Sequence, residues 1–310
     1  MSTELGKQHI EISLISLILL LWQRKILIIL VTVLFTTGGV VYSLSIPNQY
    51  KAEVMLIPSE EGQSGGLSAL ANQFGGLAGM AGLNLSGDAS KKPKIALQLL
   101  KSKSFLIDFV KRHNLDVLIF ASEKWDAKTN TVLLDEDLYD VNTQKWVREF
   151  NFPKKLTPSE QEIYRLFVKM IDSKFDNREG TYRISVEYFS PYLAATWANL
   201  LVEDINEKMR QVDIIQANKS IEYLKLQLKN TNLKTTESVF FGLIEEQTKK
   251  SMLAQVQEDY VFVVIDPAMA PEKKSNPKRA LICILFLLLG GLIASGYVFF
   301  IHFRGSESPR

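Results

Sequence analysis

Cysteine and histidine are scarce in this sequence of 310 residues. Cys283 is the one cysteine, and the three histidines are His9, His113 and His302. A single cysteine excludes an internal disulfide framework and a multi-cysteine zinc site. Three histidines so far apart do not suggest a histidine metal cluster, so we predict neither a metal nor another cofactor.

An excess of charge of one sign is also lacking. The chain has 36 Lys and Arg residues against 34 Asp and Glu, and residues 47–279 carry 31 of each kind. Binding to nucleic acid requires clustered Lys and Arg that neutralise phosphates. The balanced composition therefore predicts no nucleic-acid partner.

Catalytic motifs are missing as well: there is no nucleophile elbow, no Walker motif and no metal-ligand spacing. Residues 62–87 are rich in glycine but lack the Gly-Lys-Ser/Thr of a phosphate loop, which favours an apolar loop that packs against a neighbour. The acidic residues between 135 and 140 lack the turn glycine and the closing glutamate of a calcium loop, which favours a solvated turn. We predict no catalytic residues.

Two long uncharged runs dominate the ends of the chain. Residues 26–46 and 280–301 contain no charged side chain, and the second run continues through residue 303 before Arg304. About 20 apolar residues are needed to cross the hydrocarbon core of a bilayer. The first run is too long for the apolar core of a signal peptide, and 25 residues precede it. We predict two transmembrane helices, 26–46 and 280–303.

The orientation of these helices follows from the Lys and Arg residues beside them. Lys7, Arg24 and Lys25 precede the first run, and Lys51 alone follows it closely. This bias favours a cytoplasmic N-terminus, although four basic residues between 273 and 279 argue for the opposite orientation of the second helix. The first helix usually dominates. We therefore predict that 1–25 and 304–310 are cytoplasmic and that 47–279 lies outside.

The middle of the chain has the pattern of a mixed α/β base. Strand alternation is clear at 50–57 and 181–188, and 260–266 is a further apolar, β-rich run. A helix is predicted over 93–113, and a capping box at 157–160 opens another that reaches about 173. Residues 120–156 look irregular. The predicted base comprises 47–189 and 258–272.

A long helical arm is predicted over 190–257. Ser190-Pro191 has the composition of a helix start, and apolar residues then recur at three- and four-residue steps for about 40 residues, until 230–236 breaks the pattern before a returning helix. One hairpin buries a single face of each helix, so we expect the rest of the stripe to pack against identical neighbours. The residues predicted for this packing are Leu193, Trp197, Leu201, Ile205, Met209 and Val212.

Prolines and glycines are concentrated towards the C-terminus. Small residues let helices approach closely in lipid, which predicts a contact with the first span near Gly38 and Gly39 or with a partner protein in the membrane. Prolines before the span would act as stiff spacers, because proline fixes φ and donates no backbone hydrogen bond. The residues of this predicted motif are Pro267, Pro271, Pro277, Lys278, Gly290, Gly291 and Gly296.

These segments resemble the Wzz chain-length determinants of Gram-negative bacteria. The similarity is carried by SIEYLKLQL, LIEEQTKKSMLA and DYVFVVIDPAMAPEKKSNPKRALI, and by LSALANQFGGLAGMAG and ALQLLKSKSFL earlier in the chain. It extends over residues 10–303 and is strongest after 190. Two departures are visible: Asn276 stands where the family often has serine, and one additional residue separates Pro267 from Pro271.

The resemblance implies an α+β inner-membrane protein with two transmembrane helices that flank a periplasmic base and a long helical hairpin. Members form homo-oligomeric rings among the membrane lipids. With the Wzy polymerase they set the modal length of a lipid-linked polysaccharide, the O-antigen of lipopolysaccharide.

Other functions are alternatives to this one. Enterobacterial common antigen, capsule or exopolysaccharide could be the polymer instead. The missing Walker motif and C-terminal tyrosine cluster separate the chain from capsule-exporting relatives with a tyrosine kinase. A membrane-anchored periplasmic enzyme acting on glycans is a remote alternative.

Overall fold

The computed structural model describes residues 21–59, 91–230 and 234–306. The chain forms two compact units. One comprises the terminal segments Met1–Pro47 and Asn276–Arg310, and the other is the central segment Asn48–Ser275. The glycine-rich loop expected over 62–87 lies outside the described residues.

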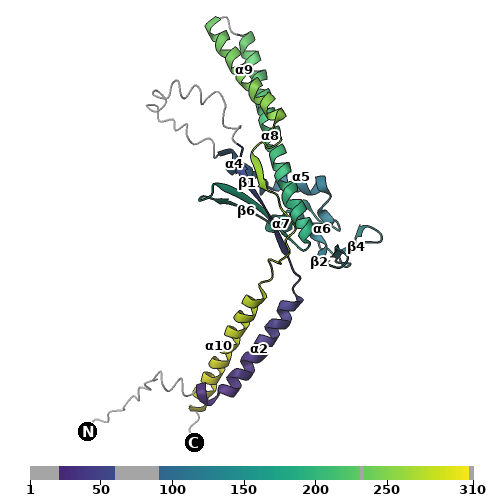
Figure 1. The fold of residues 1–310 in the computed structure, drawn as a ribbon. Helices are drawn as coiled ribbons and strands as arrows, with labels where there is room; N and C mark the ends of the chain where they lie inside the picture. Colours follow the sequence, from purple (N-terminus) through teal and green to yellow (C-terminus); the bar gives the residue numbers. More distant parts are fainter. Residues whose placement is uncertain (1–20, 60–90, 231–233, 307–310) are drawn as a thin grey trace, which may run out of the picture. The chain divides into compact units, whose positions relative to one another are not determined.

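The terminal unit is a pair of long helices that lie side by side, α2 (Lys25–Ser45) and α10 (Arg279–Ser306) (Figure 1). Both are long and apolar enough to cross a membrane: the most apolar windows of the spans Lys25–Ser45 and Arg279–Ile301 have mean hydropathies of 2.2 and 2.5. Within the most apolar windows only 11% and 17% of residues are buried. A core helix of a soluble protein would be mostly buried, so the exposure agrees with two transmembrane helices.

The central unit contains a four-stranded antiparallel sheet in the order β6-β7-β1-β8. Its strands are β1 (Tyr50–Pro58), β6 (Ile171–Asp176), β7 (Thr181–Tyr188) and β8 (Phe262–Asp266). The strands predicted at 50–57, 181–188 and 260–266 are confirmed, whereas β6 occupies residues where the preceding helix was expected to end. Alternate side chains of β1 and β7 form the core face: Ala52, Val54, Leu56, Tyr182, Ile184, Val186 and Tyr188.

Four shorter helices belong to the same base: α4 (Lys91–Leu100), α5 (Lys103–His113), α6 (Asp116–Phe120) and α7 (Glu160–Met170). The single helix predicted over 93–113 was wrong at Ser102. That residue is extended, and its hydroxyl accepts a hydrogen bond from the Phe105 amide, so it begins a second helix. The capping box of α7 is formed by Ser159 and Glu162, two residues later than predicted.

Residues 116–156 form a small lobe, which we call the hairpin lobe. After α6 it contains the hairpin β2 (Ser122–Asp126) with β3 (Thr131–Leu134) and the short pair β4 (Tyr139–Asp140) with β5 (Lys145–Trp146). Trp146 packs edge-on against Phe120 and Tyr139, with ring centroids 5.6 and 5.1 Å apart. The prediction of an irregular segment over 120–156 missed these strands because each is too short to show alternation.

The arm consists of α8 (Pro191–Lys229) and α9 (Lys234–Val256), the green hairpin in Figure 1. Ser190 caps α8 as predicted: its hydroxyl accepts a hydrogen bond from the Leu193 amide, and Pro191 occupies the first turn. The first half of α8 packs against β1 and β7, and the second half packs against α9.

Candidate functional site

The closest helix contacts in the terminal unit are made by one glycine on each span. A Cβ atom added to Gly39 would lie 2.6 Å from Cγ of Phe286, and one added to Gly290 would lie 2.8 Å from Cβ of Phe35. Each glycine therefore receives a phenylalanine from the opposite helix. Lipid tails are as apolar as the side chains of a span, so no hydrophobic force drives two spans together. Helices in lipid associate instead by packing closely at small residues.

The other glycines of the two spans are open. A Cβ atom on Gly38, Gly291 or Gly296 would meet no atom of the described residues within 4 Å. On α10 the buried residues are instead Gly290, Ala294 and Val298, which recur every four residues on one face. Gly290 and Gly39 thus lie where the two spans touch, and the faces carrying Gly291 and Gly296 point elsewhere.

The proline-rich segment after β8 is fixed to the base by an asparagine of α8. Asn199 donates a hydrogen bond to the carbonyl of Ala268 (3.0 Å) and accepts one from the Ala268 amide (2.9 Å). Pro267 is exposed beside this contact, and Pro271 is half-buried. Within the terminal unit, Pro277 follows a cis peptide bond, and the neighbouring Lys278 is exposed.

The apolar stripe of α8 divides into two halves. Trp197, Leu201, Ile205 and Met209 belong to the core of the same protomer, with at most 6% of each residue exposed, and Leu193 packs against that core. The sheet of the same chain covers these side chains, so they are not available to a neighbouring copy. Of the six residues predicted for oligomer packing, only Val212 is exposed, at 46%.

Beyond the base the stripe continues uncovered along the arm. At 100° per residue, Val212, Ile215, Tyr223 and Leu226 lie within about 80° of one another on the same side as the buried half. Between 46% and 62% of each is exposed. We call these four residues the upper stripe. The returning helix packs against the opposite side of α8, where Ala217 is fully buried, so nothing in the described part of the chain covers the upper stripe.

A buried asparagine joins α8 to the edge strand β8. The side-chain oxygen of Asn206 accepts hydrogen bonds from the amides of Val261 (3.0 Å) and Phe262 (2.9 Å), and its nitrogen donates to the Phe262 carbonyl (2.8 Å). Sequence reasoning missed this residue. The available signal was a polar side chain beside the apolar positions of the stripe, which must find partners if it is buried.

An ionic cluster fixes the root of the arm. The Asp213 carboxylate lies 2.8 Å from Nζ of Lys92 and 3.9 Å from Nζ of Lys250, and it accepts a hydrogen bond from the Tyr260 hydroxyl (2.5 Å). Burial favours a higher pKa for Asp213, but the hydrogen bonds from Lys92 and Tyr260 outweigh it and hold the pKa below its ordinary value. Burial and the Asp213 carboxylate together raise the pKa of Tyr260. The cluster therefore links α4, both arm helices and the chain that enters β8.

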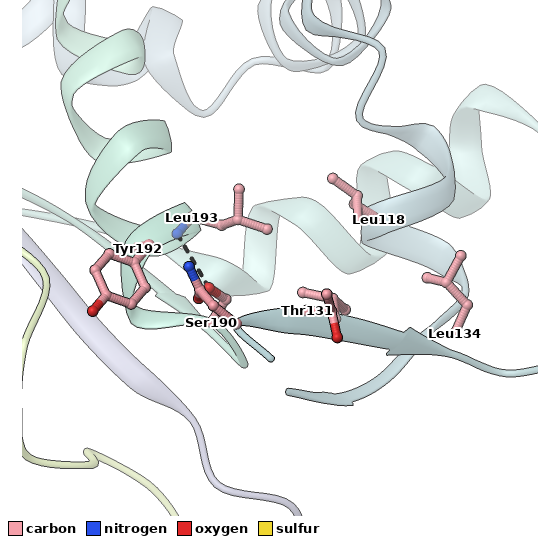
Figure 2. A pocket seen from close by; sticks show the side chains of 8 residues that line it. Leu118, Thr131, Leu134, Ser190, Tyr192 and Leu193 are labelled. Atoms are coloured by element: carbon pink, nitrogen blue, oxygen red, sulfur yellow. Dashed lines mark hydrogen bonds between the residues drawn. The ribbon is translucent and has the colours of Figure 1, made fainter. Parts of the chain in front are cut away.

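A hollow of about 380 Å³ lies between the hairpin lobe and the start of α8. Figure 2 shows Leu118, Leu134 and Leu193 around it, with the hydrogen bond between Ser190 and the Leu193 amide at its edge. None of its lining residues is acidic, basic, a histidine or a cysteine, so no such group lies in the lining beside the hydroxyls of Thr131, Ser190 and Tyr192. The lining consists of Leu118, Asn130, Thr131, Val132, Leu134, Ser190, Tyr192 and Leu193.

Among residues 21–59, 91–230 and 234–306 no three His, Cys, Asp or Glu side chains come together in a group that could hold a metal ion. The acidic turn at 135–140 is closed by its own hydrogen bonds, because carboxylate oxygens of Asp135 and Asp140 accept from the amides of Asp137 and Asn142.

Comparison with known proteins gives two family matches. The Wzz model, described as chain length determinant protein, matches residues 10–113. The GNVR model, described as "G-rich domain on putative tyrosine kinase", matches residues 221–303. No curated protein sequence matches the chain.

Two solved structures are similar to the chain. One is described as a full-length bacterial polysaccharide co-polymerase; it is 12% identical, with a TM-score of 0.41, and the alignment covers 96% of this chain and 100% of that one. The other is a fragment of WzzB, a polysaccharide co-polymerase from Salmonella Typhimurium. It is 11% identical, with a TM-score of 0.31, and the alignment covers 74% of this chain and 100% of that one.

Proposed function

Because the chain belongs to the Wzz family of chain length determinants, we propose that it sets the modal length of the O-antigen of lipopolysaccharide. It does so as a co-polymerase, a regulator that catalyses no reaction itself and acts with a Wzy-type polymerase on a lipid-linked polysaccharide. The observation that carries this proposal is the family match over residues 10–113, which includes the first span, the central strand β1 and helices α4 and α5.

The proposed location is the bacterial inner membrane, with both termini in the cytoplasm and residues 47–279 in the periplasm. Lys7, Arg24 and Lys25 before the first span support this orientation. The arm would then extend into the compartment in which the polymer grows. Cysteines placed at the exposed residues Asn130 and Lys225, both outside the upper stripe, in a Cys283→Ala background, should react with a membrane-impermeant maleimide after the outer membrane is permeabilised.

A homo-oligomeric ring is the proposed assembly. The upper stripe supports it, since four large side chains on one side of an isolated helical hairpin would otherwise remain in water. Identical copies related by rotation can cover the same stripe on every protomer and close into a ring. The open glycine faces at Gly291 and Gly296 are the proposed contact with the polymerase, because small residues admit a further helix.

The test is the polymer itself. Deletion of the gene in its own host should change the lipopolysaccharide ladder from a modal cluster to a distribution that decays towards short chains. The intact gene supplied in trans should restore the cluster. An unchanged ladder in the deletion strain, with the protein present in the wild type, would reject the O-antigen as the polymer.

The GNVR match favours a second polymer. That model describes a domain found on tyrosine kinases, and it covers the end of α8, α9, β8 and the second span of this chain. Capsule, exopolysaccharide or enterobacterial common antigen is therefore the alternative product whose length is regulated. Measuring the size distribution of these polymers in the same deletion strain separates the two proposals.

A further inference from the structure

The most exposed large apolar side chain in the described part of the chain belongs to a loop between β5 and α7. Phe152 is 96% exposed, and Val147, Phe150 and Leu156 of the same loop are 48%, 51% and 42% exposed. We call residues 147–156 the aromatic loop. Four apolar side chains within ten residues on the surface of one loop mark it as an interaction surface.

The aromatic loop is held in place by a buried arginine. The Arg148 guanidinium is 6% exposed and donates hydrogen bonds to the carbonyls of Lys155 and Leu156 and to both carboxylate oxygens of Glu162 (3.0 and 3.1 Å). It also lies 4.9 Å above the ring of Phe120. One side chain therefore joins the two ends of the loop to each other and to α7, which presents the phenylalanines in a fixed arrangement.

The charges around these phenylalanines are mostly positive. Lys145, Lys154 and Lys155 are exposed, against a single exposed acid, Glu149, because the charge of Arg148 is paired with Glu162. Aromatic rings bracketed by lysines are typical of surfaces that lie in the interface between lipid and water. There the rings enter the acyl boundary and the ammonium groups stay among the headgroups.

Building on the topology and function proposed above, we propose that the aromatic loop inserts Phe150 and Phe152 into the periplasmic surface of the lipid bilayer. Only residues 46–49 separate the first span from β1, and four extended residues reach about 14 Å at most. Within the central unit Tyr50, the first residue of β1, contacts Trp125 of the hairpin lobe with ring centroids 5.6 Å apart. The lobe that bears the loop therefore packs against the end of β1 that directly follows the first span in the chain.

This contact would give the base a third attachment to the membrane besides its two spans. It would restrain the tilt of the arm relative to the bilayer. The occupant is lipid, because exposed lysines on both sides of the rings remain solvated at a headgroup layer. A contact with a second copy would have to bury these charges against another protein.

The experiment uses the full chain in proteoliposomes. Phe152→Cys in a Cys283→Ala background carries an environment-sensitive dye, and nitroxides on the lipid acyl chains near the headgroup serve as quenchers. The matched control is Glu136→Cys, an exposed position in the acidic turn of the same lobe. We expect blue-shifted, quenched emission at residue 152 and aqueous, unquenched emission at 136. Equal, unquenched spectra at the two positions would overturn the proposal.

Two further arms identify the occupant. Lys154→Glu combined with Lys155→Glu should reduce quenching at residue 152 in vesicles containing phosphatidylglycerol, with a smaller effect in phosphatidylcholine alone. If Phe152→Cys instead cross-links to a second copy, or its dye is shielded without lipid quenching, the contact is with protein and the lipid proposal is rejected. A wild-type chain that restores the polymer ladder while the dye at 152 stays aqueous would reject this contact and leave the proposed function standing.

Discussion

Adjacent glycines on the second span provide a matched pair of variants for testing the helix contact. A Cβ atom at Gly290 would lie 2.8 Å from Cβ of Phe35 and 3.2 Å from the backbone Cα of Thr32. Neither atom is the far end of a flexible side chain, so Gly290→Ala must push the two helices apart. At Gly291 the same methyl group meets no described atom within 4 Å, so Gly291→Ala leaves the helix pair undisturbed.

The size of the effect follows from overpacking, which typically costs about 1–3 kcal/mol. Because each 1.4 kcal/mol is a factor of ten, Gly290→Ala should weaken the association of the two spans by about 5-fold to 100-fold. Gly291→Ala should change it less than about twofold. The assay is energy transfer in micelles between a donor-labelled peptide of residues 21–48 and an acceptor-labelled peptide of residues 276–306.

Gly39→Ala provides the reciprocal test from the first span, since its methyl group would meet Cγ of Phe286 at 2.6 Å. It should weaken association in the same way as Gly290→Ala. If the variants at 290 and 291 associate equally well, the two phenylalanine–glycine contacts do not hold the spans together. If only Gly291→Ala weakens association, the helix pair uses the opposite face of α10.

Three other regions of the fold yield separate expectations. Val212→Glu should lower the oligomer mass measured by light scattering without shifting the midpoint of thermal unfolding. Leu201→Ala, at a fully buried side chain, should cost about 2–5 kcal/mol of stability. Equal thermal midpoints for the two variants would contradict the division of the stripe into a buried and an exposed half. Ser190→Ala, which removes the cap of α8, should cost about 1 kcal/mol, read from the same thermal curves. Hydrogen bonds from Arg148 lower the pKa of Glu162 from 4.5 to about 2, so this carboxylate stabilises the folded state above about pH 4.5 and the contribution is lost as the pH falls towards 2. Glu162→Gln should flatten the acid limb of the pH–stability curve between those values, and an unchanged limb would show that the pair contributes nothing.

Most elements of the base could be predicted because their signals are local. Tyr182, Ile184, Val186 and Tyr188 alternate with polar residues, and all four side chains are buried in β7. The start of α8 was visible in Ser190-Pro191 for the same reason. Helix interruptions that contain no proline or glycine could not be predicted. The break before α5 depends on the extended backbone of Ser102, and the residues around it are typical of a continuous helix.

The glycines of the second span show that a small-residue motif predicts a helix contact but does not specify which face of the helix makes it. Small residues predicted a close helix contact, but neighbouring positions on a helix point about 100° apart, and the sequence does not say which face meets the partner. Only the pairing of α10 with α2 distinguishes Gly290, which receives Phe35, from Gly291, which is open. The attachment of the proline-rich segment could not be predicted either, since it depends on Asn199, a residue some 70 positions earlier in the chain.

The apolar stripe of α8 likewise could be predicted without its contacts. Periodicity finds an apolar face, but it carries no information about what covers that face at each height along the helix. Trp197, Leu201 and Ile205 are covered by a sheet that includes β1, from a much earlier part of the sequence, and the sheet ends before the stripe does. The first half of this continuous apolar pattern therefore forms part of the core of the protomer. In its second half, from Val212 onwards, nothing in the described part of the chain covers it. For this reason a charge introduced at the upper stripe should separate assembly from folding, whereas a charge at Met209, three residues before Val212, should not.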